Sequence, residues 1–165
     1  MQLLLVRHAI AFDRSAARWP DDGERPLTPE GMERARQAAQ GLKRIAEPPA
    51  RVLVSPLTRA QQTASILTRF GGWPEATACA ELLPSAAPDE LLALLARVRD
   101  RCIAGVGHEP ALSRLIAACV PGGASAAAFE MKKMGVARLA FPGAARAGRG
   151  RLEWLLPPKV LRAAR

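Results

Sequence analysis

Short apolar runs alternate with amphipathic helical patterns along this chain, and this alternation constrains the fold more than any other feature of the sequence. Residues 3–6 are a continuous apolar run, and residues 51–54 and 102–106 also have the length and largely apolar composition of buried strands. Longer helical patterns lie between them. Strands that alternate with helices are typical of an α/β domain with a largely parallel sheet.

Three further segments complete the predicted sheet. Residues 76–80 predict a short strand, and residues 136–141 and 151–156 predict a closing pair of strands. Because 165 residues fit one domain of ordinary size, we expect a single three-layer α/β domain over residues 1–165. It should have a largely parallel central sheet of about six strands, with helices on both faces. Residues 157–165 are expected to form a basic tail.

Capping residues mark where the helices should begin and end. Thr28 before Pro29 is a typical N-cap followed by a proline at the first helical position. Ser55 before Pro56 has the same pattern and is expected to cap a second helix, which the glycines at positions 71 and 72 would end. Four helices are expected by these criteria: residues 28–47, residues 55–71, and two that begin near residues 88 and 110.

Composition narrows the class of protein. Hydrophobic residues make up 49% of the chain and charged residues 24%, as in ordinary folded proteins, so disorder is not expected. No apolar run approaches the roughly 20 residues that span a bilayer, and the first strand follows Met1 without a basic leader. The three cysteines lie in apolar surroundings without metal-ligand spacing: Cys79, Cys102 and Cys119. We therefore expect a cytoplasmic protein with reduced thiols and no membrane partner.

The net charge of +9 is concentrated in one part of the chain. Residues 130–165 hold nine Lys or Arg and two Glu, a net charge of +7. Such a surplus can steer phosphorylated proteins or nucleic acid toward one end of a molecule. Because the seven aromatic residues do not alternate with basic ones, a nucleic-acid partner is not expected. One hypothesis is that Arg146, Arg149 and Arg151 guide an acidic phosphoprotein, and the alternative is that they only solvate one face.

Polar residues follow three of the predicted strands at the point where each strand ends. Arg7 and His8 follow the first strand, Ser55 follows the second and His108 the third, and Arg59 lies four residues after Ser55. In parallel sheets, ligands bind outside the carboxyl ends of the strands, so these side chains are candidates to hold one phosphate. Each also has a structural interpretation: a buried or capping histidine, an arginine on a solvated helix face, and a serine that acts only as an N-cap.

Three motifs in this order resemble the signatures of the histidine phosphatase superfamily, which has the phosphoglycerate mutase-like fold. They are Leu-Val-Arg-His-Ala at residues 5–9, Ser-Pro-Leu-Thr-Arg-Ala at residues 55–60 and Gly-His-Glu-Pro at residues 107–110. The short length and the segment Arg-Pro-Leu-Thr-Pro-Glu-Gly at residues 25–31 are most similar to the compact SixA-type phosphohistidine phosphatases.

The resemblance implies a role for each matched residue. It makes His8 the nucleophile that takes the phosphoryl group, and it makes Arg7, Arg59 and His108 ligands of the phosphoryl oxygens, with Ser55 as a further phosphate-binding candidate. Two guanidinium groups near His8 would disfavour its imidazolium form and stabilise the charge of the transferring group. No metal and no cofactor are expected, since no cluster of Asp or Glu offers a metal a site.

A proton donor is harder to assign. Larger members of the superfamily carry a Glu between the second and third motifs, and here the candidates are Glu81, Asp89 and Glu90. Asp89 and Glu90 equally suit the first turn of a helix, and Glu81 a loop. An enzyme without a strong general acid should prefer a good leaving group, such as the imidazole of phosphohistidine.

We therefore predict a metal-independent phosphatase that works through a phosphohistidine intermediate and dephosphorylates phosphohistidine on a protein. One alternative is a phosphomonoester phosphatase that acts on small phosphorylated metabolites with the same residues. The other is a non-catalytic module that binds phosphate or nucleic acid.

Overall fold

Six strands form one central sheet. The computed structural model describes residues 1–165. The strands are β1 (Gln2–Arg7), β2 (Arg51–Val54), β3 (Ala76–Ala78), β4 (Cys102–Gly107), β5 (Val136–Ala140) and β6 (Arg151–Leu156). Their order across the sheet is β3-β2-β4-β1-β5-β6. The first four are parallel, and β5 and β6 pair antiparallel to their neighbours. The predicted largely parallel sheet of six strands is confirmed.

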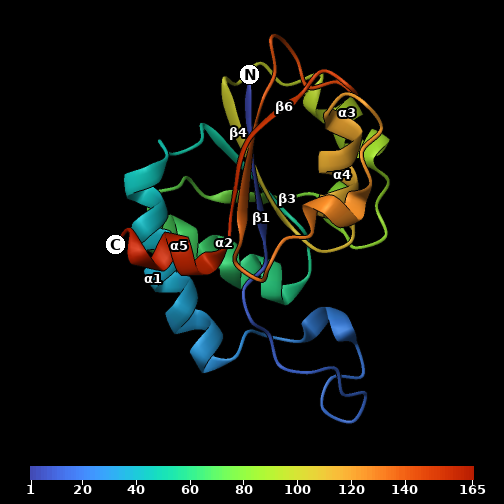
Figure 1. Cartoon of the computed structure of the whole chain (residues 1–165). Coiled ribbons are helices and arrows are strands. Elements are labelled where there is room, and N and C mark those ends of the chain that lie inside the picture. Colours follow the sequence, from blue (N-terminus) through green and yellow to red (C-terminus); the bar gives the residue numbers. More distant parts are fainter.

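Helices cover both faces of this sheet. Helices α1 (Pro29–Ile45), α2 (Thr58–Gly71) and α5 (Pro158–Ala163) lie on one face, and α3 (Pro88–Leu95) and α4 (Ala111–Cys119) lie on the other (Figure 1). Three short 3-10 turns, η1 (Asp22–Glu24), η2 (Ala80–Leu82) and η3 (Ala126–Phe129), lie in the connections. Alternate residues of β1 serve the two layers: Leu4 and Val6 pack with α1 and α2, and Leu3 and Leu5 pack with α3 and α4. The three-layer architecture is therefore as predicted.

Helix α1 begins, and helices α1 and α2 end, where the capping pattern predicts. The Thr28 hydroxyl accepts a hydrogen bond from the Gly31 backbone N–H at 2.9 Å, and Pro29 occupies the first helical position. The helix ends at Ile45, just before the two prolines that could not continue it. Gly72, in the left-handed conformation with φ of 74°, ends α2.

Ser55 is not the N-cap of α2, contrary to the expectation from sequence. The Ser55 backbone N–H still donates to the Val106 carbonyl at 3.0 Å, so this residue continues the β2–β4 ladder. The proline that follows disfavours helical backbone at Ser55. The helix consequently begins at Thr58, with Leu57 at the N-cap, and Arg59 lies in its first turn.

The basic segment at the C-terminus is a helix packed against α1. Within the expected tail of residues 157–165, Pro158–Ala163 forms α5, and Leu161 is fully buried. Gly41 makes the contact close: a Cβ at this position would lie 1.7 Å from the Leu161 carbonyl oxygen. The segment is therefore part of the packed structure.

The cysteines are unpaired. Cys79 and Cys119 are buried and Cys102 is half-buried. Burial raises the pKa of the Cys79 and Cys119 thiols to about 12, so both are protonated near neutral pH. None of the helices combines the length and the apolar character that crossing a bilayer requires.

Candidate active site

The polar residues that follow β1, β2 and β4 meet at one edge of the sheet. These strands are neighbours in the order β2-β4-β1. The ladder continues one residue past their ends, because the His8 N–H donates to the Gly107 carbonyl at 3.0 Å and Ser55 bonds to β4 in the same way. The rings of His8 and His108 are consequently close, with centroids 4.9 Å apart. The segment that follows β1 extends beyond this edge of the sheet (Figure 1).

The ring of His8 is held in one tautomer. Its Nδ1 lies 2.7 Å from the Ala9 carbonyl oxygen, and since a carbonyl can only accept, Nδ1 carries the proton. In the neutral ring the lone pair then resides on Nε2. Burial lowers the pKa of His8 to about 3, and the charges of Arg59, Arg7 and Lys133 act in the same direction, against the hydrogen bond to Ala9. His8 is therefore neutral near pH 7, with an unprotonated Nε2.

The peptide after His8 is anchored to α2. The Ala9 N–H donates to the Thr63 hydroxyl oxygen at 3.0 Å, and that hydroxyl donates to the Arg59 carbonyl at 2.7 Å. Thr63 is fully buried. One side chain therefore ties the backbone that orients the His8 ring to the first turns of the helix that carries Arg59.

His108 pairs with Ser55. Its Nε2 lies 2.9 Å from the Ser55 hydroxyl oxygen, and both residues are buried. Burial, together with the smaller effects of the neighbouring His8, Arg59, Arg7 and Arg25, lowers the pKa of His108 to about 3. The Ser55 hydroxyl thus orients a second neutral imidazole, in place of the capping role expected from sequence.

Two arginines act on the same site, since the charges of both lower the pKa values of His8 and His108. Arg7 donates from Nη1 to the Met131 carbonyl at 2.5 Å, and Arg59, only 3% exposed, donates from Nη1 to the Asp22 carbonyl at 2.8 Å. The Nε atoms of both arginines are buried without a hydrogen-bond partner. Because an unmet buried donor is costly, an oxyanion that accepts from these guanidinium groups would be bound favourably.

Asp22, which sequence reasoning did not single out, neutralises part of this charge. Its carboxylate lies 2.8 Å from Arg25, 3.3 Å from Arg59 and 3.6 Å from Arg14. The hydrogen bond from Arg25, together with the charges of these arginines, holds the pKa of Asp22 below its usual range. The sequence of residues 10–27 is polar and mixed in charge, which is a weak signal of a loop beside a site. The structure places this loop against Arg59 through η1.

Hydrogen bonds of Glu109 and Met134 also help to position Arg7 and His8. The Glu109 carboxylate accepts from the Met131 N–H at 3.0 Å and from the Ser113 hydroxyl at 2.6 Å, which fixes the segment whose carbonyl binds Arg7. Met134 has a φ of 64°, and its N–H is shared between the carbonyls of Arg7 and His8 at 3.0 and 3.2 Å. Glu109 lies in the third motif, whereas no sequence signal marks Met134.

The candidate proton donors lie apart from this network. The Glu81 carboxylate accepts from the Cys79 thiol at 3.2 Å, and hydrogen bonds to its backbone N–H and to that thiol keep its pKa low. Asp89 is exposed in the first turn of α3. The Glu90 carboxylate accepts from the Ala87 backbone N–H at 3.1 Å. None of the three carboxylates bonds to Arg7, His8, Arg59 or His108, and a low pKa makes Glu81 a poor acid.

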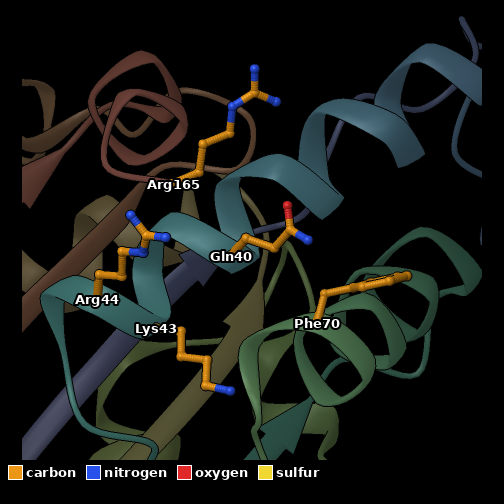
Figure 2. Close-up of a pocket in the computed structure, with 5 residues that line it drawn as sticks. All are labelled: Gln40, Lys43, Arg44, Phe70 and Arg165. Atoms are coloured by element: carbon orange, nitrogen blue, oxygen red, sulfur yellow. The ribbon is translucent and has the colours of Figure 1, made fainter.

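A separate cavity of about 620 Å³ lies at the C-terminal end of α1. Figure 2 shows its lining, with Gln40, Lys43 and Arg44 on α1, Phe70 on α2 and Arg165 after α5. Lys43 and Arg44 occupy the last turn of α1, where a cation interacts favourably with the helix dipole. Its basic lining therefore has a structural explanation.

Comparison with known proteins agrees with the fold and the motifs. Residues 3–82 match the model of the histidine phosphatase superfamily, branch 1. The phosphohistidine phosphatase SixA of Escherichia coli is 33% identical over 129 residues, which cover 74% of this chain and 76% of that protein. An uncharacterized protein of Picosynechococcus sp. is 36% identical over 149 residues, 88% of each chain. The structure of the protein histidine phosphatase SixA complexed with tungstate superposes with a TM-score of 0.85 at 27% identity, covering 98% of this chain and 99% of that one.

The sheet architecture, with His8 and His108 at the carboxyl ends of its parallel strands, defines a protein of the phosphoglycerate mutase-like fold. The chain belongs to the histidine phosphatase superfamily, and the resemblance inferred from its three motifs is confirmed. Its similarity to these phosphatases identifies it as a phosphatase.

Proposed function

We propose that this protein is a metal-independent phosphohistidine phosphatase that works through a phosphorylated His8. The observation that carries the proposal is the state of the His8 ring. Its Nδ1 is committed to the Ala9 carbonyl, its pKa is lowered to about 3, and the charges of the buried Arg59 and the half-buried Arg7 act on it. A neutral imidazole with a free Nε2 next to an oxyanion site is what in-line attack on phosphorus requires.

The reaction has two displacement steps. In the first, His8 Nε2 forms a bond to phosphorus as the bond from phosphorus to the substrate's nitrogen breaks, and the departing imidazole takes its proton from water. In the second, water attacks phosphorus and gives up a proton to the solvent, which restores the proton taken in the first step; the bond to His8 breaks, and phosphate leaves. Arg7, Arg59 and His108 would donate to the phosphoryl oxygens throughout, with Ser55 orienting His108. The positive charge comes from the two arginines, so no step calls for a metal ion.

A phosphohistidine substrate suits the surroundings of the site better than an ester does. An alkoxide leaving group needs a general acid, whereas Glu81 has a lowered pKa and Asp89 is exposed on α3. Imidazole is a far better leaving group. The relatives named phosphohistidine phosphatase and protein histidine phosphatase support the same substrate class.

The decisive experiment compares kcat/KM for a protein phosphorylated on histidine with kcat/KM for a panel of small phosphate monoesters. We expect the phosphohistidine protein to be preferred by at least about 10²-fold, since proton transfer to an ester leaving group typically contributes a factor of this size. Preference for a monoester would replace the proposal with the small-metabolite alternative, and no turnover of either would favour a binding module. Treatment with EDTA should leave the rate unchanged, and a strict requirement for added metal would contradict the metal-independent mechanism.

A further inference from the structure

A basic cavity of about 240 Å³ adjoins the candidate active site. Ala9 and Ile10, the residues directly after His8, form one wall. The other walls come from the first half of α1, the segment of residues 132–134 and the start of α5. Its cationic side chains come from three places in the sequence: Arg34, Lys132, Lys133, Lys159 and Arg162. The charge of Lys133 reaches His8, whose pKa it helps to lower, so the cavity and the nucleophile share one electrostatic environment.

Most of this positive charge has no carboxylate nearby. Arg34 forms an ion pair with Glu30 on its own helix. The ion pair of Lys132 with the exposed Glu130 is long, at 3.9 Å. Lys133, Lys159 and Arg162 form no ion pair within 4.0 Å and no side-chain hydrogen bond. Like charges gathered around one hollow repel one another, and an anion that enters it relieves that repulsion.

The walls of the cavity are held at fixed positions by close backbone contacts. A Cβ at Gly31 would lie 2.0 Å from the Ile10 carbonyl oxygen, and the same helix meets α5 at Gly41. Pro157 and Pro158 fix the backbone where the chain enters α5. The cationic side chains therefore project from a preformed frame, which lowers the entropic cost of binding a partner.

The sequence suggested that Arg146, Arg149 and Arg151 could guide an acidic phosphoprotein. These three residues lie at the end of the sheet away from the candidate active site. Arg151 pairs with Ala140, and Ala140 pairs with Gln2 at the start of β1. The candidate active site is at the other end of this six-residue strand, a distance of about 17 Å at about 3.3 Å per residue. Arg146 and Arg149 precede Arg151 in the same connection. The basic residues near the active site are instead those of the cavity.

We propose that this cavity docks acidic side chains of the protein that carries the phosphoryl group; this rests on the proposed function. Its volume of about 240 Å³ equals that of about eight waters at about 30 Å³ each, which is room for an acidic side chain or two. Lys132 and Lys159 are exposed, so the positive charge continues from the cavity onto the surrounding surface. A protein partner with Asp or Glu near its phosphohistidine can meet both parts at once.

The test compares two variants that each lose three positive charges. The cavity variant is Lys132→Gln, Lys159→Gln and Arg162→Gln, and the matched control is Arg146→Gln, Arg149→Gln and Arg151→Gln at the opposite edge. For a phosphohistidine protein with acidic residues near its phosphorylated site, kcat/KM of the cavity variant should fall about 10-fold at low salt. Phosphoramidate, which has no acidic side chain, should be turned over within about two-fold of wild type by both variants. The loss should shrink as salt rises from about 0.01 to 0.15 M, because the Debye length falls from about 30 to 8 Å.

Three results would overturn the docking site: no loss in the cavity variant, an equal loss on the protein and on phosphoramidate, or an equal loss in the control variant. Failure of the proposed function looks different, because wild-type protein would then hydrolyse monoesters but not the phosphohistidine protein. A binding measurement separates the two further. Titration of isotope-labelled wild type with a hexaglutamate peptide should shift the amide resonances of Ile10, Lys133 and Lys159. Absence of these shifts, or shifts only around Arg149, would reject the cavity as an acidic docking site whatever the substrate.

Discussion

His8 combines two properties that ordinary histidines do not share. The residue is 7% exposed, and the one hydrogen bond of its ring is made by the nitrogen that would not attack. Burial and the nearby cations keep it neutral, and the Ala9 carbonyl selects the tautomer. A side chain that replaces His8 must therefore supply both a lone pair and the correct orientation, and no other nucleophilic group lies in this position.

Replacement of His8 by Ala should lower turnover by at least about 10³-fold, because the covalent step is lost. Rapid quenching of wild type with a labelled substrate should place an acid-labile label on His8. Near-normal activity in a folded His8→Ala protein would contradict the mechanism, as would label on a Ser, Asp or Cys.

The two buried histidines should also make the folded state sensitive to acid. Their pKa values are about 3 in the folded protein against 6.5 in the unfolded chain, so the unfolded chain binds more protons below about pH 6.5. Each histidine should therefore remove up to about 1.4 kcal/mol of unfolding free energy per pH unit as the pH falls toward 3. Between about pH 6 and 5, urea titrations should show wild type losing about 1 kcal/mol more than His8→Asn. An identical loss in both proteins would mean that His8 is not buried in the neutral form.

The sequence predicted which residues meet but not what holds them. His8, His108, Arg7 and Arg59 could be placed because strand ends and motifs are local patterns. Asp22, which bonds to Arg59 across 37 residues, could not, since the path of a polar loop leaves no periodic signal. Met134 was equally hidden, because its positive φ is imposed by the carbonyls of Arg7 and His8 and not by its own residue type.

At the scale of elements, α5 is defined by its contact with α1 more than by its own sequence. The segment was expected to be a basic tail, since six residues with one buried side chain carry almost no amphipathic pattern. Helix α2 shows the converse case, in which a local capping pattern at Ser55 yielded to the sheet ladder and to the hydrogen bond with His108. Long, strongly periodic elements such as α1 were predictable, and short elements fixed by tertiary contacts were not.

The substitution Gly41→Ala tests this contact. In a solvated helix the change would stabilise by roughly 1 kcal/mol, but here the new Cβ would lie 1.7 Å from the Leu161 carbonyl oxygen, which belongs to the backbone. We expect a net loss of about 1 to 3 kcal/mol in unfolding free energy, as for other overpacked sites. Gly143→Ala, where a Cβ meets nothing within 4 Å, is the control and should stay within about 0.5 kcal/mol of wild type. Equal stability of the two variants would show that α5 does not pack as closely as described.

At the scale of the whole molecule, most of the cations of residues 130–165 fall into two groups at opposite ends of the sheet. One group of cations surrounds the edge that holds His8, and the other lies in the connection between β5 and β6 at the opposite edge. The sequence showed the surplus in residues 130–165 but could not divide it, because the division depends on the antiparallel direction of β5. Only the first group can act on an anion bound at the candidate active site with little screening.

The division predicts where an oxyanion stabilises the protein. Vanadate that binds only the folded state at about 100 times its Kd should add about 2.7 kcal/mol, which for a chain of this size raises the Tm by about 5 to 11 °C. In Arg59→Ala that shift, measured against the variant's own Tm, should largely disappear, because the buried guanidinium group with its free Nε is gone. Arg69→Ala, an exposed change on the same helix, should keep the full shift. A full shift in Arg59→Ala would place the anion elsewhere, and its loss in Arg44→Gln would then assign it to the cavity in Figure 2.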